Sequence, residues 1–186
     1  MGQPYDQEYL AAPLPDADTQ DIRGNATRQA KEWAVKWHRL LRRLGHGYAW
    51  DVASRIAVKE VWFQGHQDTS MKKEVRMVSQ LNVAQDMCDV DGNLDKGCMS
   101  MLIDESSAIA LILHNAIEGS PNIIAVSQSI NFSFHASAAL GTKLRIVSRS
   151  VTTGGTIDTT RSEIWDDGNH RLVASGVQNQ ASRSKW

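Results

Sequence analysis

The chain has 186 residues, a formal net charge of −1 and 41% hydrophobic residues. That length suffices for one domain with its own core, and the near balance of charges gives no global field that favours nucleic acid or an anionic membrane. Cys88 and Cys98 are too few for a disulfide framework and lack the spacing of a zinc site, so we expect no metal and a reducing, cytoplasmic location. No apolar run approaches the roughly 20 residues that span a bilayer, so we expect no membrane span.

The N-terminal part divides into two predicted segments. Residues 1–24 hold all but one of the prolines and many polar residues, and we expect a poorly ordered arm or a surface strap. Residues 25–50 predict an amphipathic helix with Asn25 as N-cap and Gly45 as stop. The charged outer face of this helix could contact the phosphates of a nucleotide-bearing ligand or stay solvated. That face consists of Arg28, Lys31, Lys36, Arg39, Arg42 and Arg43.

Residues 51–186 predict a single α+β domain. Their patterns alternate between strand-like segments and one long apolar segment, 98–117, which is typical of a helix enclosed by a sheet. The order predicts a largely antiparallel sheet around that helix. Strands are expected over 56–64, 73–84, 123–134, 142–152, 155–166 and 171–181.

Three stretches carry a resemblance to a known family. They are DMCDVDGNLDKGCMSMLIDESSAIAL at 86–111, INFSFHASAALGTKLRIVSRSV at 130–151 and EIWDDGNHRLVASG at 163–176. With their surroundings they resemble the hotdog-fold acyl-CoA thioesterases of the phenylacetate-pathway and small human type. The resemblance implies a hotdog fold, with an antiparallel sheet wrapped around one long central helix, here preceded by the N-terminal amphipathic helix. It also implies a homodimer or dimer of dimers that binds acyl-CoA along the subunit interface.

The resemblance also assigns site residues. Family members carry an Asn, a Gly, a His-Gly-Gly run and an Asp on the central helix. Their backbone N–H groups at the helix N-terminus polarise the thioester carbonyl, while the Asp of the partner subunit activates water or attacks directly. A serine on a strand would hold that carboxylate or the water, and an asparagine follows it in the family's strand motif. The matching positions are Asp89, Gly92, Asp95, Lys96, Gly97 and Asp104, with Ser127 and Asn131 on the strand.

Three substitutions, at Asp89, Asp95 and Lys96, depart from the family motif. Asp89 replaces the Asn and Asp95 replaces the His, which puts negative charge where an oxyanion must develop. The Lys96 side chain could crowd the thioester or pair with a carboxylate. If Asp89, Asp95 and Asp104 approach one another, one of them would be protonated near neutrality and could donate a proton. Plainer interpretations are loop turns for Asp89 and Asp95, a surface carboxylate for Asp104, and cross-strand hydrogen bonds for Ser127 and Asn131.

Three functions follow as hypotheses. The first is hydrolysis of an acyl thioester by carboxylate-assisted water, with coenzyme A or phosphopantetheine as part of the substrate and no other cofactor. The second is acid–base catalysis, a dehydration, isomerisation or cyclisation, on a polyketide-like small molecule. The third is a non-catalytic acyl-binding dimer with the helix of Trp33 and Trp37 as its interface. Exposure of those tryptophans would favour the third.

Overall fold

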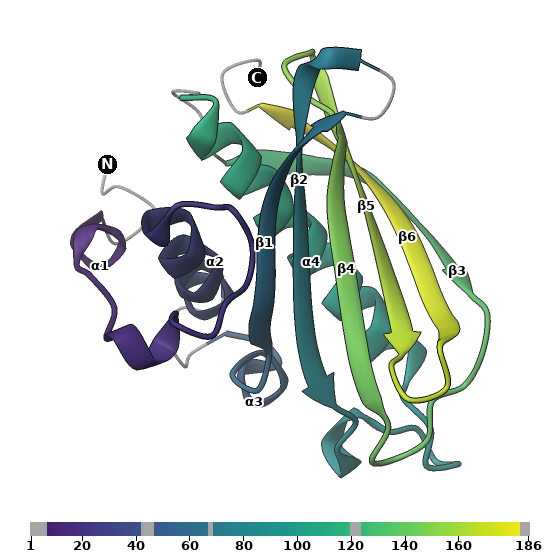
Figure 1. Ribbon diagram of the computed structural model, residues 1–186. Helices are drawn as coiled ribbons and strands as arrows, with labels where there is room; N and C mark the ends of the chain where they lie inside the picture. The colour runs from purple at the N-terminus through teal and green to yellow at the C-terminus, as the bar shows by residue number, and fades with distance from the viewer. Residues whose placement is uncertain (1–6, 42–46, 67–68, 120–123, 183–186) are drawn as a thin grey trace.

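The computed structural model describes residues 7–41, 47–66, 69–119 and 124–182. A six-stranded sheet of order β1-β2-β4-β5-β6-β3, antiparallel throughout, lies against one long helix, α4 (Lys96–Ile117). Figure 1 shows α4 packed on one side of this sheet, with the N-terminal helices beside β1 at its edge. The strands are β1 (Ala57–His66), β2 (Thr69–Asn82), β3 (Ala125–Phe134), β4 (Lys143–Thr152), β5 (Ile157–Asp166) and β6 (Arg171–Ser182). The predicted α+β hotdog arrangement is confirmed.

Helix α4 is the centre of the fold because its side chains are apolar or small on most faces. It approaches the sheet closely at Gly176 of β6, where an added Cβ would lie 2.7 Å from Cγ2 of Ile103. By length and composition alone α4 could cross a membrane, yet 67% of its most apolar window is buried inside this fold. The expectation that no apolar run approaches spanning length is therefore wrong for α4, whose apolar side chains form the core.

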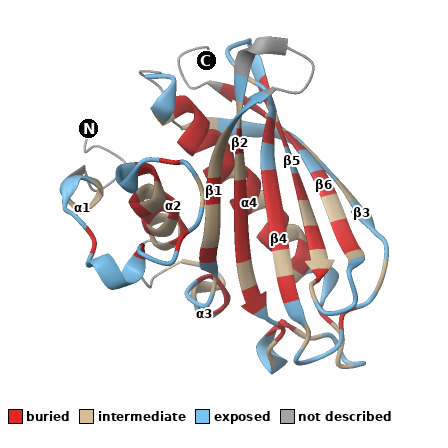
Figure 2. Ribbon diagram, viewed as in Figure 1, coloured by how far each residue is buried: buried red, intermediate tan, exposed pale blue. Residues whose placement is uncertain are grey.

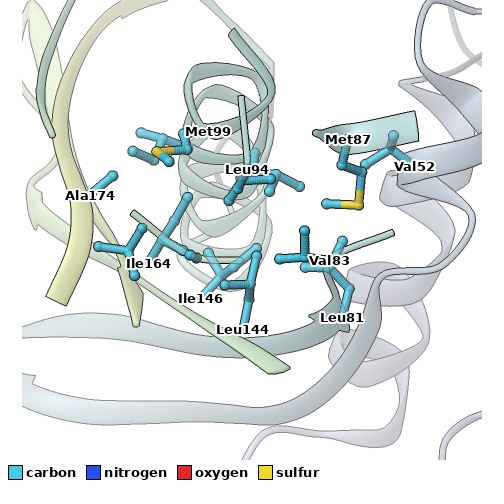
Figure 3. Packing of buried hydrophobic residues seen from close by; sticks show 14 residues of the cluster. Val52, Leu81, Val83, Met87, Leu94, Met99, Leu144, Ile146, Ile164 and Ala174 are labelled. Atoms are coloured by element: carbon cyan, nitrogen blue, oxygen red, sulfur yellow. The ribbon is translucent and has the colours of Figure 1, made fainter. Parts of the chain in front are cut away.

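The main core lies between the first half of α4 and the middle strands. Leu102 and Ile103 of α4 are fully buried, and Figure 3 shows the side chains of Leu144, Ile146 and Ile164 gathered on the strands below the helix. The alternation predicted for the second strand is also confirmed. Its inward residues Val75, Met77, Ser79 and Leu81 are buried.

The N-terminal helix is shorter than predicted. Helix α2 (Arg28–Leu40) has Thr27 as its N-cap, with Oγ1 accepting from the backbone N–H of Ala30 at 3.3 Å. Asn25 is therefore not the cap. Its side chain instead accepts from and donates to the backbone of Phe63 at 2.7 and 2.8 Å, which ties this segment to β1. The predicted stop, Gly45, lies outside the described residues, and a short helix that we did not expect, α3 (Trp50–Ala53), precedes β1.

The predicted charged face of α2 is only partly correct. Lys36 is buried, and its ammonium donates to the carbonyls of Leu10 and Ala12. Arg28 and Arg39 form ion pairs with acidic residues of the preceding segment. That segment, with α1 (Gln7–Ala11) and the 3-10 helix η1 (Asp16–Asp18), runs along α2 as a strap. Residues 1–6, Arg42 and Arg43 lie outside the described residues.

The two tryptophans of α2 pack inside their own chain. Trp37 is 0% exposed, and Trp33 is partly buried against the same hydrophobic cluster, which also holds Ile109 and Leu113 of α4. Figure 2 shows the buried side of α2 turned toward β1 and α4. The exposure that would favour a tryptophan-based interface is therefore absent at these two positions.

Candidate active site

Asp104 and Ser127, which are 23 positions apart in the sequence, are joined by one side chain. The amide nitrogen Nε2 of Gln178 donates to Oδ1 of Asp104 at 2.6 Å and to Oγ of Ser127 at 2.7 Å. Asp104 comes from the third turn of α4, Ser127 from the edge strand β3 and Gln178 from the neighbouring strand β6. The structure thus brings together two of the four residues predicted as catalytic.

Gln178 is held from its other end as well. Its Oε1 accepts from Oγ of Ser107 at 2.5 Å and from Nε2 of Gln180 at 2.6 Å. The side chain is 0% exposed, and its four hydrogen bonds use both amide protons and both oxygen lone pairs. Such a fully bonded amide has one orientation, so it fixes the position of the Asp104 carboxylate.

The sequence analysis did not identify Gln178, because the strand pattern around it indicates a different buried residue. A strand with one buried face normally turns its apolar residues inward, which would favour Val177 over Gln178 as the buried residue. The structure has the reverse, with Val177 38% exposed and Gln178 fully buried. The signal that could have found it is the spacing of Gln178 and Gln180, two polar residues on one face of a strand that closes the sheet around α4.

Asp95 occupies the N-terminus of α4. Its Oδ1 accepts from the backbone N–H of Gly97 at 2.7 Å and of Cys98 at 3.4 Å, so it acts as the N-cap. Gly97 permits this close approach, because an added Cβ would lie 2.9 Å from that oxygen. The carboxylate of Asp95 therefore lies where the resemblance expects the oxygen of a thioester, on one of the two amides that would polarise it.

Asp89 has a local role in the loop before α4. Its Oδ1 accepts from the backbone N–H groups of Asp91 and Asn93, both at 3.0 Å, which is the loop-turn chemistry of the plainer interpretation. Asp104 lies nine residues beyond Asp95 on the same chain segment, or about 13 Å along a helix. One chain therefore does not gather Asp89, Asp95 and Asp104 into the predicted carboxylate cluster.

The two remaining predicted residues lie around these groups. The ammonium of Lys96 is 5.9 Å from the ring centroid of Phe134, a cation–π contact at the end of β3. Ile130 is opposite Gln178 in the sheet register, and Asn131 is opposite Val177. Because neighbouring strand residues point to opposite faces, Asn131 is on the face away from α4 and Asp104.

A pocket of about 220 Å³ opens beside the N-terminus of α4, bounded by α3 and by the 3-10 helix η3 (Gln85–Met87). Asp95, Gly97 and Cys98 form one of its sides. Burial, followed by the charges of Asp95 and Asp86, raises the pKa of the Cys98 thiol to about 11, so this thiol is not a nucleophile near neutrality. Within the described residues, no group of three or more His, Cys, Asp and Glu side chains is arranged to hold a metal ion.

Comparisons with known proteins agree with the fold described above. Residues 92–173, which include α4 and the strands β3, β4 and β5, match the family model described as the thioesterase superfamily. A search of curated proteins found no match. Among solved structures, thioesterase superfamily member 2 from zebra fish is similar at 18% identity and a TM-score of 0.64, over 79% of this chain and 94% of that one.

Two further structures extend the likeness. Thioesterase superfamily member 2 from Mus musculus is 16% identical with a TM-score of 0.60, over 79% of this chain and 96% of that one. A Streptococcus mutans protein bound to acetyl CoA is 20% identical with a TM-score of 0.51, over 57% of this chain and 80% of that one. At these identities the likeness shows the fold. The predicted resemblance to hotdog thioesterases is confirmed, and residues 92–173 match the thioesterase superfamily.

Proposed function

We propose that this chain hydrolyses an acyl thioester of coenzyme A or of a carrier protein, with Asp104 as the general base that activates water. The observation that carries the proposal is the shared hydrogen bonding of Asp104 and Ser127 to the Gln178 amide. A general base must lie within hydrogen-bonding reach of the water it deprotonates, and a neighbouring hydroxyl can hold that water. Asp104 is only partly buried, so solvent reaches this residue.

The proposed site needs two copies of the chain. Asp104 lies seven residues, or about 10 Å along the helix, beyond the amide of Gly97, which is too far for both to act on one carbonyl carbon. Strand β3, which carries Ser127, lies at the edge of the sheet and can pair with a second copy. In such a dimer, Asp104 of one copy would face the amides of Lys96 and Gly97 of the other.

The Asp95 carboxylate competes with a thioester oxygen for the backbone N–H of Gly97. A thioester oxygen can accept from Gly97 only if the Asp95 carboxylate leaves that amide, since Oδ1 occupies it at 2.7 Å. An N-cap hydrogen bond of this kind is worth about 1 kcal/mol, so a bound substrate can displace it at modest cost. The carboxylate would still repel the developing oxyanion, and turnover by the parent chain would be slow.

The same contact favours a second candidate function. If Asp95 keeps the Gly97 amide, the site retains two carboxylates, from Asp95 and Asp104, and no free donor at Gly97 for an oxyanion. Two carboxylates in different surroundings suit proton transfer at a small hydrophobic molecule, as in a dehydration, isomerisation or cyclisation. A polyketide-like substrate fits this alternative.

The first test measures free-thiol release from a panel of acyl-CoAs. We expect Asp104→Asn to lower kcat by about a hundredfold or more, equal to about 2.7 kcal/mol of transition-state stabilisation, because the amide cannot accept the water's proton. Asp21→Asn, the same change at an exposed position of the N-terminal strap, is the matched control. Equal activity of Asp104→Asn and the parent would eliminate Asp104 as the base.

A second variant separates the two candidate functions. Asp95→His removes the carboxylate from the Gly97 amide and supplies a donor, so thiol release should increase if oxyanion repulsion limits the parent. Activity that appears only in Asp95→His would favour the acid–base alternative for the parent chain. If neither protein releases thiol while both remain folded, hydrolysis is wrong and a non-catalytic acyl-binding role gains support.

A further inference from the structure

The inward face of the edge strand β3 is not covered by α4. Ser127 and Phe134 are opposite Gln180 and Ala174 of β6 in the sheet register, so the side chains of all four point toward the helix side. Gln180 and Ala174 are 3% and 0% exposed, whereas Ser127 is exposed and Phe134 is 42% exposed. Helix α4 therefore covers β6 but leaves this face of β3 open. β3 is also the last strand of the described sheet, opposite β1 (Figure 1), so its outer backbone edge can pair with another strand.

The two ends of this open face carry different parts of the proposed site. Ser127, at one end, shares the Gln178 amide with the Asp104 carboxylate. Phe134, at the other end, lies beside the Lys96 ammonium, which is 5.9 Å from the centroid of its ring. In an antiparallel pair of identical strands the two ends exchange, so the Phe134 end of one copy lies beside the Ser127 end of the other. This exchange brings Lys96 of one copy toward Asp104 of the other.

Within one chain the same two groups do not meet. Lys96 precedes Asp104 by eight residues on α4, or about 12 Å along the helix axis. Helical side chains lean toward the N-terminus of their helix, so the Lys96 side chain extends away from Asp104. The adjacent Asp95 uses Oδ1 to accept from the backbone N–H groups of Gly97 and Cys98, and neighbouring helix residues do not face each other. Among the described residues, the Phe134 ring is the one contact of the Lys96 ammonium.

We propose that the Lys96 ammonium of one copy forms an ion pair with the Asp104 carboxylate of the other, which makes Lys96 a positioning residue of the shared site. The inference rests on the proposed function for the role of Asp104 as base, but the ion pair itself does not depend on turnover. A cation beside this carboxylate favours its ionised form, which is the form that accepts a proton from water. The ammonium also offsets the Asp95 carboxylate, so the three side chains together carry the charge of a single carboxylate.

The first test detects the ion pair without any substrate. Unlabelled chains and chains labelled with heavy nitrogen are refolded together and treated with a carbodiimide, which joins a lysine amine to a contacting carboxylate as an amide and takes up the water as a urea. We expect peptide mass spectrometry to find a Lys96–Asp104 link between a heavy and a light peptide. Lys143 and Asp167, 3.5 Å apart within one chain, are the positive control and should give no mixed-mass link. Formation of the control link without a mixed-mass Lys96–Asp104 link would overturn the inference.

A mixed dimer tests whether the two residues act from different chains. Lys96→Gln and Asp104→Asn chains carry different tags and are purified as a mixed dimer, which has one intact site only if Lys96 and Asp104 of each site come from opposite chains. We expect thiol release at about half the parent rate, against about a tenth for Lys96→Gln alone and about a hundredth for Asp104→Asn alone. A mixed dimer that is no more active than Lys96→Gln alone would contradict the ion pair.

Further changes at Lys96 separate charge from shape. Lys96→Arg keeps the cation and should restore most of the activity that Lys96→Gln loses, and an equal loss in both would contradict the ion pair. Lys96→Gly removes the side chain and should be as slow as Lys96→Gln. Faster release in Lys96→Gly than in the parent would show that Lys96 crowds the thioester, and the inference would be wrong. Lys73→Gln, at an exposed position of β2, is the matched control and should leave the rate unchanged.

These results also separate the ion pair from the proposed function. A mixed-mass link in a chain that releases no thiol would support the ion pair and contradict the hydrolase. Thiol release by the parent, with no mixed-mass link and no recovery in the mixed dimer, would support the hydrolase and overturn the ion pair.

Discussion

The face of the sheet that packs on α4 differs between its two ends. At one end, Leu144, Ile146 and Ile164 meet Leu102 and Ile103 of α4 in one hydrophobic cluster. At the other end the same strands present hydroxyl and amide side chains to the helix. These are Ser148, Ser150, Asp158, Thr160, Ser162, Gln178 and Gln180, all buried. One helix therefore packs on two kinds of surface.

The two ends contribute differently, one to the stability of the fold and the other to the position of the Asp104 carboxylate. Apolar burial contributes about 25 cal/mol per Å² and needs no orientation, whereas a buried polar group costs free energy unless it is hydrogen-bonded. Five of these seven side chains are hydrogen-bonded, as in Ser148 to Ser162 at 2.6 Å and Ser150 to His114 at 3.3 Å. Asp158 Oδ1 and Thr160 Oγ1 have no hydrogen-bond partner among the described residues. Networks of this kind specify one arrangement of side chains, and Asp104 lies at the edge of this network. We infer that the apolar end supplies most of the stability and the polar end fixes the base.

Removing a large side chain from the apolar end gives the largest expected loss of stability. Leu102→Ala should lower the free energy of unfolding by about 2–5 kcal/mol, because Leu102 is fully buried and a cavity would remain. Urea denaturation measures this, and the thiol-release rate of the remaining folded protein should be close to that of the parent. A loss below about 1 kcal/mol would contradict the inference that the apolar end supplies most of the stability.

Replacing Gln178 should mainly change the position of the Asp104 carboxylate. Gln178→Leu leaves Asp104, Ser107 and Ser127 without their shared partner, so we expect about 1–3 kcal/mol of destabilisation. We also expect a fall in kcat with little change in KM, since the base moves while the binding surfaces remain. Gln128→Leu, on the exposed side of β3, is the matched control. Normal kcat in Gln178→Leu would show that this amide does not position the base.

Much of the fold could be predicted from the sequence, and the reason is visible in particular residues. The apolar run of α4 and the alternation of Val75, Met77 and Leu81 report burial directly, because hydrophobic periodicity follows secondary structure. Asp104 and Ser127 came from the resemblance to a family. Their link through Gln178 depends on pairing between strands distant in sequence, which no local pattern contains. The polar end of the sheet even inverts the pattern, since Ile157 is 41% exposed and Asp158 is buried.

The polar end should also make stability depend on pH through His114. Burial lowers the pKa of His114, so the folded chain keeps this imidazole neutral in a range where the unfolded chain protonates it. Stability should therefore fall as the pH drops below about 6.5, by at most about 1.4 kcal/mol per pH unit. His114→Gln should flatten this dependence in urea titrations between pH 7.5 and 5.5. His170→Asn, at an exposed turn position with φ of 51°, is the control that should leave it unchanged.

Two adjacent serines of α4 provide the finest comparison within the polar end. Both are 0% exposed, but Ser107 Oγ donates to Gln178 and lies 2.9 Å from the carbonyl of Asp104, whereas Ser106 Oγ has no hydrogen-bond partner among the described residues. Both alanine variants gain the same helix propensity, so the difference between them isolates the hydrogen bonds. We expect Ser106→Ala to be neutral or stabilising by a few tenths of a kcal/mol, and Ser107→Ala to cost about 1 kcal/mol and to reduce kcat. Equal losses of stability in the two variants would mean that Ser106 is bonded to an internal water, and that the network around the base extends further along α4 than the side chains alone reveal.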